Sequence, residues 1–203
     1  MYNRIESFLN ANSILYQHQY GFRKKYSTDH AILSIVEQIK TNLDNKTFSC
    51  GVFVDLEKAF DTVNHKILLS KLSHIGVDNL ANKWLTSYLS NRSQCVAVNG
   101  AKSDYSKISC GVPQGSILGP LLFLIYINDM HKSVKKSTVF HFADDTNLLF
   151  SHKNPKELKK TMNKELKLLF EWLCANRLSL NVGKIFIIFR PLKINLNDRI
   201  VVT

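Results

Sequence analysis

Two apolar segments of this sequence end in aspartate, and this feature constrains the fold more than any other. Residues 139–149 read Val-Phe-His-Phe-Ala-Asp-Asp-Thr-Asn-Leu-Leu, so Asp144 and Asp145 lie between two apolar runs. That pattern predicts a β-hairpin that presents both carboxylates at one edge of a sheet. An Asp pair is also favoured in turns by its local hydrogen bonds alone. The functional interpretation gains weight because a second apolar strand, residues 48–55, also ends in an aspartate, Asp55.

The separation of these aspartates along the chain (144 − 55 = 89 residues) means that any partnership between them is tertiary. Two unit charges about 4 Å apart repel by roughly 4 kcal/mol at an effective dielectric near 20, so the pair favours a bound cation. Carboxylate oxygens suit Mg²⁺, which binds through one or two carboxylates plus substrate phosphates. The chain has 27 Lys and Arg against 16 Asp and Glu, a net charge of +11, which favours a polyanionic partner such as nucleic acid. The residues themselves therefore indicate phosphoryl transfer with two metal ions.

Composition places the chain among globular proteins. With 203 residues and 45% hydrophobic content, it can bury one core, with or without a minor lobe. The four cysteines are scattered without a Cys-x-x-Cys pair, which is typical of reduced thiols. The N-terminus lacks the pattern of a signal peptide, and the longest apolar stretch, residues 117–127, is interrupted by Gly119-Pro120 and too short to span a bilayer. We expect a soluble, intracellular protein with no membrane partner.

The apolar periodicity predicts an α+β fold, with an antiparallel sheet of about four strands and helices mainly on one face. Strands are expected over residues 48–55, on both sides of an Asn99-Gly100 turn, in the Asp144 hairpin, and over residues 184–189. The expected helices are 29–44, 61–76, one beginning at Asp78, 116–128 and 155–176.

Caps and buried faces follow from the same periodicity. Thr28 or Asp29 is expected to cap the first helix and Asp61 the second. The expected buried positions are Ile32, Val36, Ile39 and Leu43 in the first helix, Leu68, Leu72 and Ile75 in the second, Leu80, Trp84 and Tyr88 in the third, and Leu158, Met162, Leu166, Leu169 and Leu173 in the last. Lysines 159, 160, 164 and 167 fall on other faces of the last helix, where a solvated surface is favoured over a nucleic-acid track.

Five blocks of the sequence resemble, in order, those of reverse transcriptases of the non-LTR, LINE-type retrotransposon branch. Residues 53–65 (FVDLEKAFDTVNH), 111–120 (GVPQGSILGP) and 142–145 (FADD) resemble motifs A, B and C. Residues 19–23 (QYGFR), with the Ser-Thr that follows, resemble the block before motif A, and residues 178–184 (LSLNVGK) resemble motif D. One block alone is weak, but five in the family's order are specific.

The resemblance implies an RNA-directed DNA polymerase core that adds dNTPs to the 3′-hydroxyl of a DNA primer on an RNA template. It implies that Asp55 and Asp144 hold two Mg²⁺ ions, or Mn²⁺ in their place, with Asp145 beside them and the Leu56 carbonyl as a further ligand. It also implies that Phe60 lies under the incoming sugar and excludes a 2′-hydroxyl, although Phe60 as a core residue is the alternative.

Further roles follow from the same resemblance. Gln114, with the backbone of Gly115 and Ser116, is expected to contact the nascent pair and the template. Lys184 is expected to act as general acid for the departing pyrophosphate. For Arg23, a contact with template phosphate and an ion pair with a local carboxylate are equally compatible with the sequence.

The resemblance covers about residues 3–190 and implies a domain organisation. Residues 1–47 are expected to form a partial fingers segment and residues 48–190 the palm, with finger-side helices and a hairpin within about 62–110. Residues 191–203 are expected to be a tail towards a missing thumb. The family's upstream fingers hairpin, its helical thumb, and its endonuclease and RNase H modules have no counterpart in these residues, and Ile185 replaces the Thr that usually follows the motif D Lys.

Two other functions are weighed against this one. The chain is alternatively a truncated, inactive fragment that retains only non-specific nucleic-acid binding. A phosphatase-like nucleophile at Asp55-Leu56-Glu57 is disfavoured because such sites use Asp-x-Asp. His65 and His141 have no metal-ligand partners at recognisable spacing, so structural roles are expected for both. The expected location is the nucleus and a cytoplasmic ribonucleoprotein; the motifs carry no information on oligomeric state.

Overall fold

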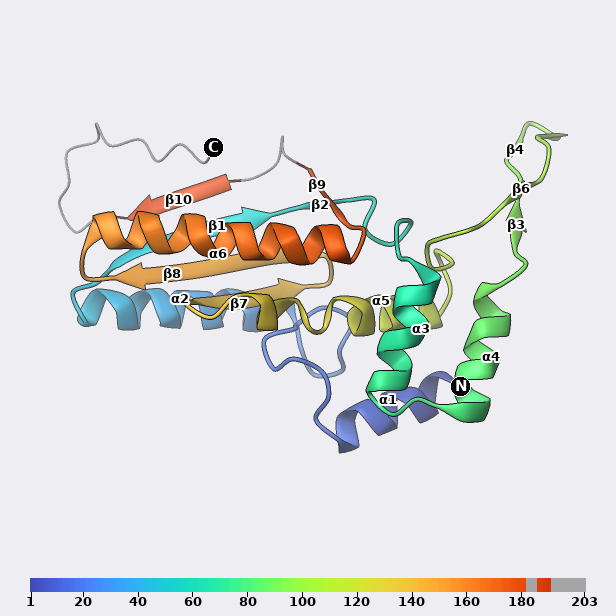
Figure 1. Cartoon of the computed structure of the whole chain (residues 1–203), viewed down its shortest axis with the longest axis horizontal. Coiled ribbons are helices and arrows are strands. Elements are labelled where there is room, and N and C mark those ends of the chain that lie inside the picture. Colours follow the sequence, from blue (N-terminus) through green and yellow to red (C-terminus); the bar gives the residue numbers. More distant parts are fainter. Residues whose placement is uncertain (182–185, 191–203) are drawn as a thin grey trace. The chain divides into compact units, whose positions relative to one another are not determined.

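The computed structural model describes residues 1–181 and 186–190, which form two compact units. One unit comprises Met1–Leu15 and Lys58–Ile127, and we call it the helical unit. The other comprises Tyr16–Glu57 and the chain from Asn128 onwards, and we call it the sheet unit. Figure 1 shows the elements of each.

The sheet unit is built on a four-stranded antiparallel sheet, which confirms the predicted α+β class. Its strand order is β10-β1-β8-β7, with bounds Phe186–Arg190, Phe48–Val54, Asp145–His152 and Ser137–Phe142. The described part of the predicted last strand is Phe186–Arg190, whereas Lys184 and the predicted tail 191–203 lie outside the described residues.

The two faces of this sheet are covered by different helices. The Cys50 Sγ contacts the Met162 Sδ at 3.5 Å, so α6 (Pro155–Ala175) covers the face that carries Cys50. Leu149 pairs with Gly51, the next residue in β1, and therefore points to the other face. On that face, Ala31 of α2 (Thr28–Asp44) packs in a buried cluster with Tyr20, Phe140 of β7 and Leu149 of β8.

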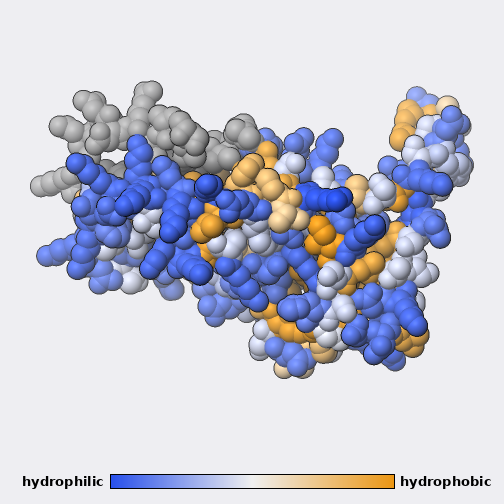
Figure 2. Space-filling view, in the orientation of Figure 1, coloured by the Kyte–Doolittle hydropathy of each residue, from blue (hydrophilic) through white to orange (hydrophobic). Residues whose placement is uncertain are grey.

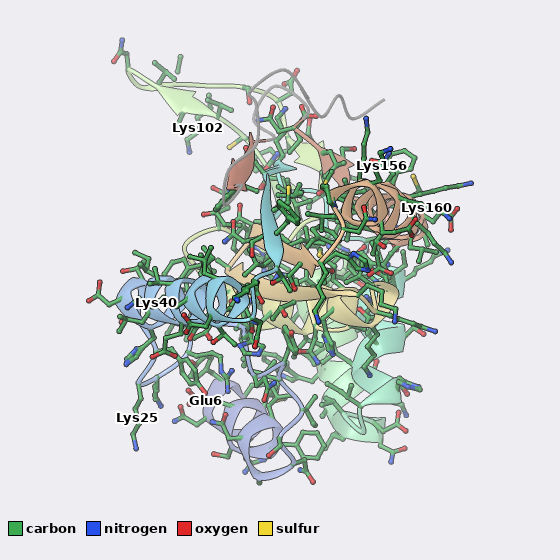
Figure 3. The ribbon with its side chains drawn as sticks, turned by 90° about the vertical axis from the view of Figure 1, so that its left-hand side faces the viewer. Glu6, Lys25, Lys40, Lys102, Lys156 and Lys160 are labelled. Atoms are coloured by element: carbon green, nitrogen blue, oxygen red, sulfur yellow. The ribbon has the colours of Figure 1, made fainter. Side chains whose placement is uncertain are left out.

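Helices thus cover both faces of the sheet, whereas the sequence predicted that they lie mainly on one. The reason is that β1 lies in the middle of the sheet and has buried residues on both faces, which requires cover on both sides. Figure 3 shows Lys40 on α2 and Lys160 on α6 on opposite sides of the sheet.

The first predicted helix exists, but its cap and its buried face differ from the prediction. Ser27 is the N-cap, and its Oγ accepts from the His30 N–H at 3.4 Å. Ile32 and Val36 are 58% and 38% exposed, whereas Ala31 is buried. Two overlapping apolar stripes run along this helix, and tertiary packing selects the one that includes Ala31.

The long helix α6 agrees with the prediction in position and in most of its buried face. Asn154 caps it by accepting from the backbone N–H groups of Lys156 and Glu157. Glu165 is buried in place of the predicted Leu166, because it accepts hydrogen bonds from the chain just after the short helix η1 (Met130–Ser133). Lysines 159, 160, 164 and 167 are exposed, and the surface over α6 is mostly hydrophilic in Figure 2.

In the helical unit, two helices pack on a buried one, and a fourth helix packs on one of these two. The buried helix α5 (Leu118–Ile127) contacts α1 (Tyr2–Ala11) and α3 (His65–His74), and α3 also contacts α4 (Asn79–Leu89). Asn64, not Asp61, caps α3, since its Oδ1 accepts from the Ile67 N–H at 3.1 Å. The predicted cap was wrong because Asp61 lies a full turn before the helix begins.

The buried face of α4 was also predicted wrongly. Leu85 and Leu89 are buried, whereas Leu80 is 82% and Trp84 43% exposed. The predicted stripe is instead a surface on which Trp84 and Tyr88 stack with ring centroids 5.5 Å apart.

A twisted β-ribbon follows α4 and contains the predicted turn. β3 (Ser93–Gln94) pairs with β6 (Ser106–Lys107), and β4 (Ala97–Val98) with β5 (Ala101–Lys102). Asn99 and Gly100 both have positive φ, 49° and 83°, as a two-residue type I′ turn requires.

No helix among the described residues is long and apolar enough to cross a membrane.

Candidate active site

The three candidate carboxylates lie at one edge of the sheet. Val54, the last residue of β1, pairs with Thr146 of β8, and Asp55 follows directly. On the other side of β8, Phe142 pairs with Asp145, which leaves Ala143 and Asp144 as the two-residue turn of the β7–β8 hairpin. The hairpin predicted from the sequence is present, and its turn lies at the edge where β1 ends.

Asp55 and Asp145 line the same pocket, which has a volume of about 510 Å³. The remaining lining is mostly apolar and includes Phe53, Phe142 and Ile35 of α2. Asp55 is half-buried and Asp145 is exposed. Both aspartates therefore contribute carboxylate groups to the lining of a mostly apolar pocket.

A side-chain amide holds Asp55 in place. Asn181 donates from Nδ2 to the Asp55 Oδ2 at 3.1 Å, and its backbone N–H donates to the Asp55 carbonyl at 2.9 Å. The adjacent pair of strands, β2 (Leu56–Glu57) and β9 (Ser179–Leu180), brings the two residues together. No role was predicted for Asn181 from the sequence. Its position in the motif D-like block was the only feature that could have pointed to a role in the site.

The donor set fits a hard cation bound partly through its substrate. Within residues 1–181 and 186–190, no group of three or more His, Cys, Asp or Glu side chains is arranged to hold a metal ion. Aspartates from two strands nevertheless provide the oxygen ligands that Mg²⁺ takes from proteins when phosphates and waters complete its shell. Leu56, whose carbonyl was the further predicted ligand, is buried beside Asp55.

Arg23 has structural partners in the sheet unit. Its Nη1 donates to the carbonyls of Tyr16 and Gln19 at 3.0 and 3.1 Å, and its guanidinium lies 4.2 Å from the centre of the Tyr26 ring. These contacts hold the loop before α2, so neither a template phosphate nor a carboxylate is needed to explain its conformation.

In the helical unit, the GVPQG loop is tied to the segment that carries Phe60. The Val112 N–H donates to the Phe60 carbonyl at 2.9 Å, and the Gly111 N–H donates to the Val63 carbonyl at 2.7 Å. Gln114 donates from Nε2 to the Asp61 Oδ1 at 2.8 Å. Asp61 is therefore a partner of Gln114 and not the predicted helix cap.

The glycines of this loop are required by its geometry. Gly111 has φ 87°, and a Cβ there would lie 2.8 Å from the Asp61 carbonyl oxygen. Gly115 has φ 77°, with open space where a side chain would be. Ser116 closes the loop by donating to the Pro113 carbonyl and accepting from the Gly119 N–H, so α5 begins at Leu118, two residues later than predicted.

Phe60 is half-buried and stacks on Phe123 of α5, with ring centroids 4.3 Å apart. This position is compatible with Phe60 as a core residue and with Phe60 under the incoming sugar, because one face of the ring packs on the core while part of the ring stays accessible.

A second, polar pocket of about 770 Å³ opens beside Gln114 in the helical unit. Three cationic side chains line it, those of Lys58, Arg92 and Lys107, against one carboxylate, that of Asp61. We call it the cationic pocket. Its charge balance and polar lining suit phosphate groups.

Comparisons with known proteins place the chain in one family. Residues 1–196 match the family model for reverse transcriptase (RNA-dependent DNA polymerase). In Drosophila melanogaster, a probable RNA-directed DNA polymerase from transposon BS is 32% identical over 84% of this chain and 19% of its own length. The corresponding protein from transposon X-element is 37% identical over 70% of this chain and 16% of its own length.

The fold is similar to that of solved telomerase structures. An apo telomerase from Candida tropicalis superposes with a TM-score of 0.66 at 16% identity, covering 93% of this chain and 36% of that one. This likeness concerns the fold alone.

The chain belongs to the reverse transcriptase family. Its relatives confirm the predicted resemblance to the non-LTR retrotransposon branch. The chain spans about a fifth of the length of the curated relatives it matches.

Proposed function

We propose that this chain is the core of an RNA-directed DNA polymerase that extends a DNA primer on an RNA template during retrotransposition. The observation that carries the proposal is the strand register, in which Asp55 directly follows β1 at the edge where the β7–β8 turn holds Asp144. Family membership supports the same reaction.

In this proposal the carboxylates of Asp55 and Asp144 hold two Mg²⁺ ions, with Asp145 and the Leu56 carbonyl beside them. When bound, Mg²⁺ supplies charge neutralisation at the transferring phosphoryl group and lowers the pKa of the attacking hydroxyl. Asn181 keeps one Asp55 oxygen engaged, which fixes the rotamer of that carboxylate.

The helical unit supplies the substrate contacts. Gln114 and the backbone at Gly115 and Ser116 contact the nascent pair and the template, and Phe60 lies under the sugar of the incoming dNTP. The cationic pocket binds phosphates of the nucleic-acid strand, because phosphate contacts supply most sequence-independent affinity. Arg23 contacts a template phosphate in this proposal. Its Nη1 already donates to the carbonyls of Tyr16 and Gln19, so the phosphate contact uses the other N–H groups of the guanidinium.

Lys184, which lies outside the described residues, is the proposed general acid for pyrophosphate. The organisation into a partial fingers segment (1–47), a palm (48–190) and a tail towards a thumb (191–203) remains part of the proposal. We also propose that the protein acts in the nucleus and in a cytoplasmic ribonucleoprotein, where its template RNA is found.

Primer extension tests the proposal. The chain is incubated with an end-labelled DNA primer on an RNA template, dNTPs and Mg²⁺, and we expect template-directed extension that EDTA abolishes. Salt-sensitive RNA binding without incorporation in either Mg²⁺ or Mn²⁺ would refute the polymerase and establish the alternative, an inactive fragment that only binds nucleic acid.

A further inference from the structure

We propose that Gln19 is a positioning residue, whose buried side-chain amide fixes the turn that carries Asp144. The inference rests on the proposed function, because it concerns the same pair of carboxylates. Nothing in the sequence motifs assigns a role to this side chain, which lies 124 residues from the turn it contacts.

Gln19 contacts the turn through both ends of its amide. The Ala143 N–H donates to the Gln19 Oε1 at 3.0 Å, and the Gln19 Nε2 donates to the Ala143 carbonyl at 3.3 Å. The same Oε1 also accepts from the Gly21 N–H at 2.8 Å. The side chain is only 3% exposed, so these hydrogen bonds form away from competing water.

The turn requires support because Ala143 has a left-handed backbone, with φ 56°. That conformation is unfavourable for an L-residue with a Cβ, so it persists only where surrounding structure holds it. Gln19 pairs with both backbone polar groups of Ala143 at once. Because Asp144 is the next residue, the direction of its side chain follows from the peptide that Gln19 holds.

The segment around Gln19 is itself built to approach the turn. It runs parallel to β7 and pairs with both backbone groups of His141. The Tyr20 N–H donates to the His141 carbonyl, and the His141 N–H donates to the His18 carbonyl, both at 2.8 Å. Gly21 then passes so close that a Cβ would lie 2.1 Å from the Ala143 nitrogen. Only glycine permits this approach, and Arg23 holds the Gln19 carbonyl from the other side.

A purely structural role for the amide makes a different prediction from a positioning role. If Gln19 only satisfied buried polar groups, its loss would lower stability and leave the Mg²⁺ requirement of the remaining folded protein unchanged. If it positions Asp144, its loss changes the rate of the chemical step and the Mg²⁺ requirement while primer–template affinity is kept.

The first test compares Gln19→Leu with Gln17→Leu, the same substitution at an exposed position of the same segment. For Gln19→Leu we expect a 10- to 100-fold lower kcat and a higher Mg²⁺ concentration at half-maximal rate, with an unchanged primer–template Kd. For Gln17→Leu we expect wild-type values. An unchanged kcat and Mg²⁺ requirement in folded Gln19→Leu, or equal losses in both variants, would overturn the positioning role.

The second test does not depend on activity. Amide hydrogen exchange followed by NMR in the wild-type chain should show a protected Ala143 N–H, and Gln19→Leu or Gly21→Ala should expose it while the amides of α6 stay protected. An unprotected Ala143 N–H in the wild type overturns the contact even if the chain polymerises. If the Ala143 N–H is protected in a wild-type chain that does not incorporate dNTPs, the proposed function is refuted, whereas the contact between Gln19 and the turn is confirmed.

Discussion

At the scale of single residues, the candidate site depends on two residues that hold the carboxylate segments from a distance. Asn181 holds Asp55, through one side-chain bond to its carboxylate and one backbone bond to its carbonyl. The Gln19 side-chain amide holds both backbone groups of Ala143, beside Asp144. Each residue lies more than a hundred residues along the chain from its partner. The geometry of the carboxylate edge is therefore set by tertiary contacts and not by the local turn alone.

Phe60 gives a prediction about sugar selection. Phe60→Val replaces the ring that is proposed to lie under the sugar with a smaller side chain. Ribonucleotide incorporation should therefore rise roughly 10- to 100-fold relative to dNTP incorporation, the size of effect expected from a change of pocket volume. The ratio of kcat/KM for a matched rNTP and dNTP measures it. Phe170→Val, at a 55% exposed ring on α6, is the control and should leave the ratio unchanged. Equal ratios in both variants and the wild type would assign Phe60 to the core alone, through its stack on Phe123.

At the scale of elements, the contact between α6 and the chain after η1 depends on a buried carboxylate. Glu165 is 3% exposed, and its Oε2 accepts from the backbone N–H groups of Lys135 and Lys136 at 2.6 and 2.8 Å. Because β7 begins immediately after these residues, the contact fixes the start of the strand that leads to the turn at Asp144.

Removing this acceptor should destabilise the sheet unit. Glu165→Ala leaves two backbone N–H groups without their partner, and we expect a loss of about 2 kcal/mol in the free energy of unfolding, with a smaller loss for Glu165→Gln, which keeps one acceptor oxygen. Urea denaturation measures both. Glu171→Ala, at an exposed glutamate of the same helix, is the control, and equal losses at the two glutamates would contradict this role.

Element positions were largely predictable from the sequence, whereas the buried faces of α2 and α4 were not. The strand β1, the Asn99-Gly100 turn, the β7–β8 hairpin and α6 each carry a strong local signal of apolar runs or turn residues. In α2, however, the stripe through Ala31 and the stripe through Ile32 have similar spacing, and only packing against the sheet distinguishes them. The N-caps were predicted wrongly for a related reason. Several polar residues precede α2 and α3, and the sequence does not show which side chain accepts a hydrogen bond from the first turn of each helix.

The residue types of the candidate site were predictable from the sequence, whereas the residues that hold them in position were not. The carboxylates and the GVPQG loop are recognisable because the chemistry restricts residue type and spacing. The contacts of Gln19 and Asn181 were not predictable, although both residues lie in recognised blocks, because their partners lie in distant segments of the chain.

At the scale of the whole molecule, buried histidine makes the sheet unit sensitive to acid. Burial lowers the pKa of His141 to about 3, with smaller contributions from His131 and His18, and its Nδ1 lies 3.0 Å from the Thr146 Oγ1. Burial also lowers the pKa of His18 and of His131. Between the ordinary pKa near 6.5 and the folded value, the unfolded chain binds a proton that the folded chain does not.

Stability should therefore fall as the pH falls below about 6.5, by up to roughly 1.4 kcal/mol per pH unit from His141 alone. Comparing urea midpoints at pH 7 and pH 5 in the wild type and in His141→Gln measures this contribution, because glutamine does not titrate. The variant should lose much less stability on acidification than the wild type. Equal losses in the two proteins would contradict the assignment of this pH dependence to His141.

The central claim is that the carboxylate edge of the sheet performs nucleotide addition, and Asp144 tests it most directly. Single-turnover incorporation of one dNTP on an RNA template is measured in the wild type, in Asp144→Asn, and in Asp44→Asn, an exposed aspartate at the end of α2 in the same unit. We expect Asp144→Asn to abolish incorporation while primer–template binding persists, and Asp44→Asn to retain the wild-type rate. If Asp144→Asn incorporates the dNTP at the wild-type rate, Asp144 is not part of the active site.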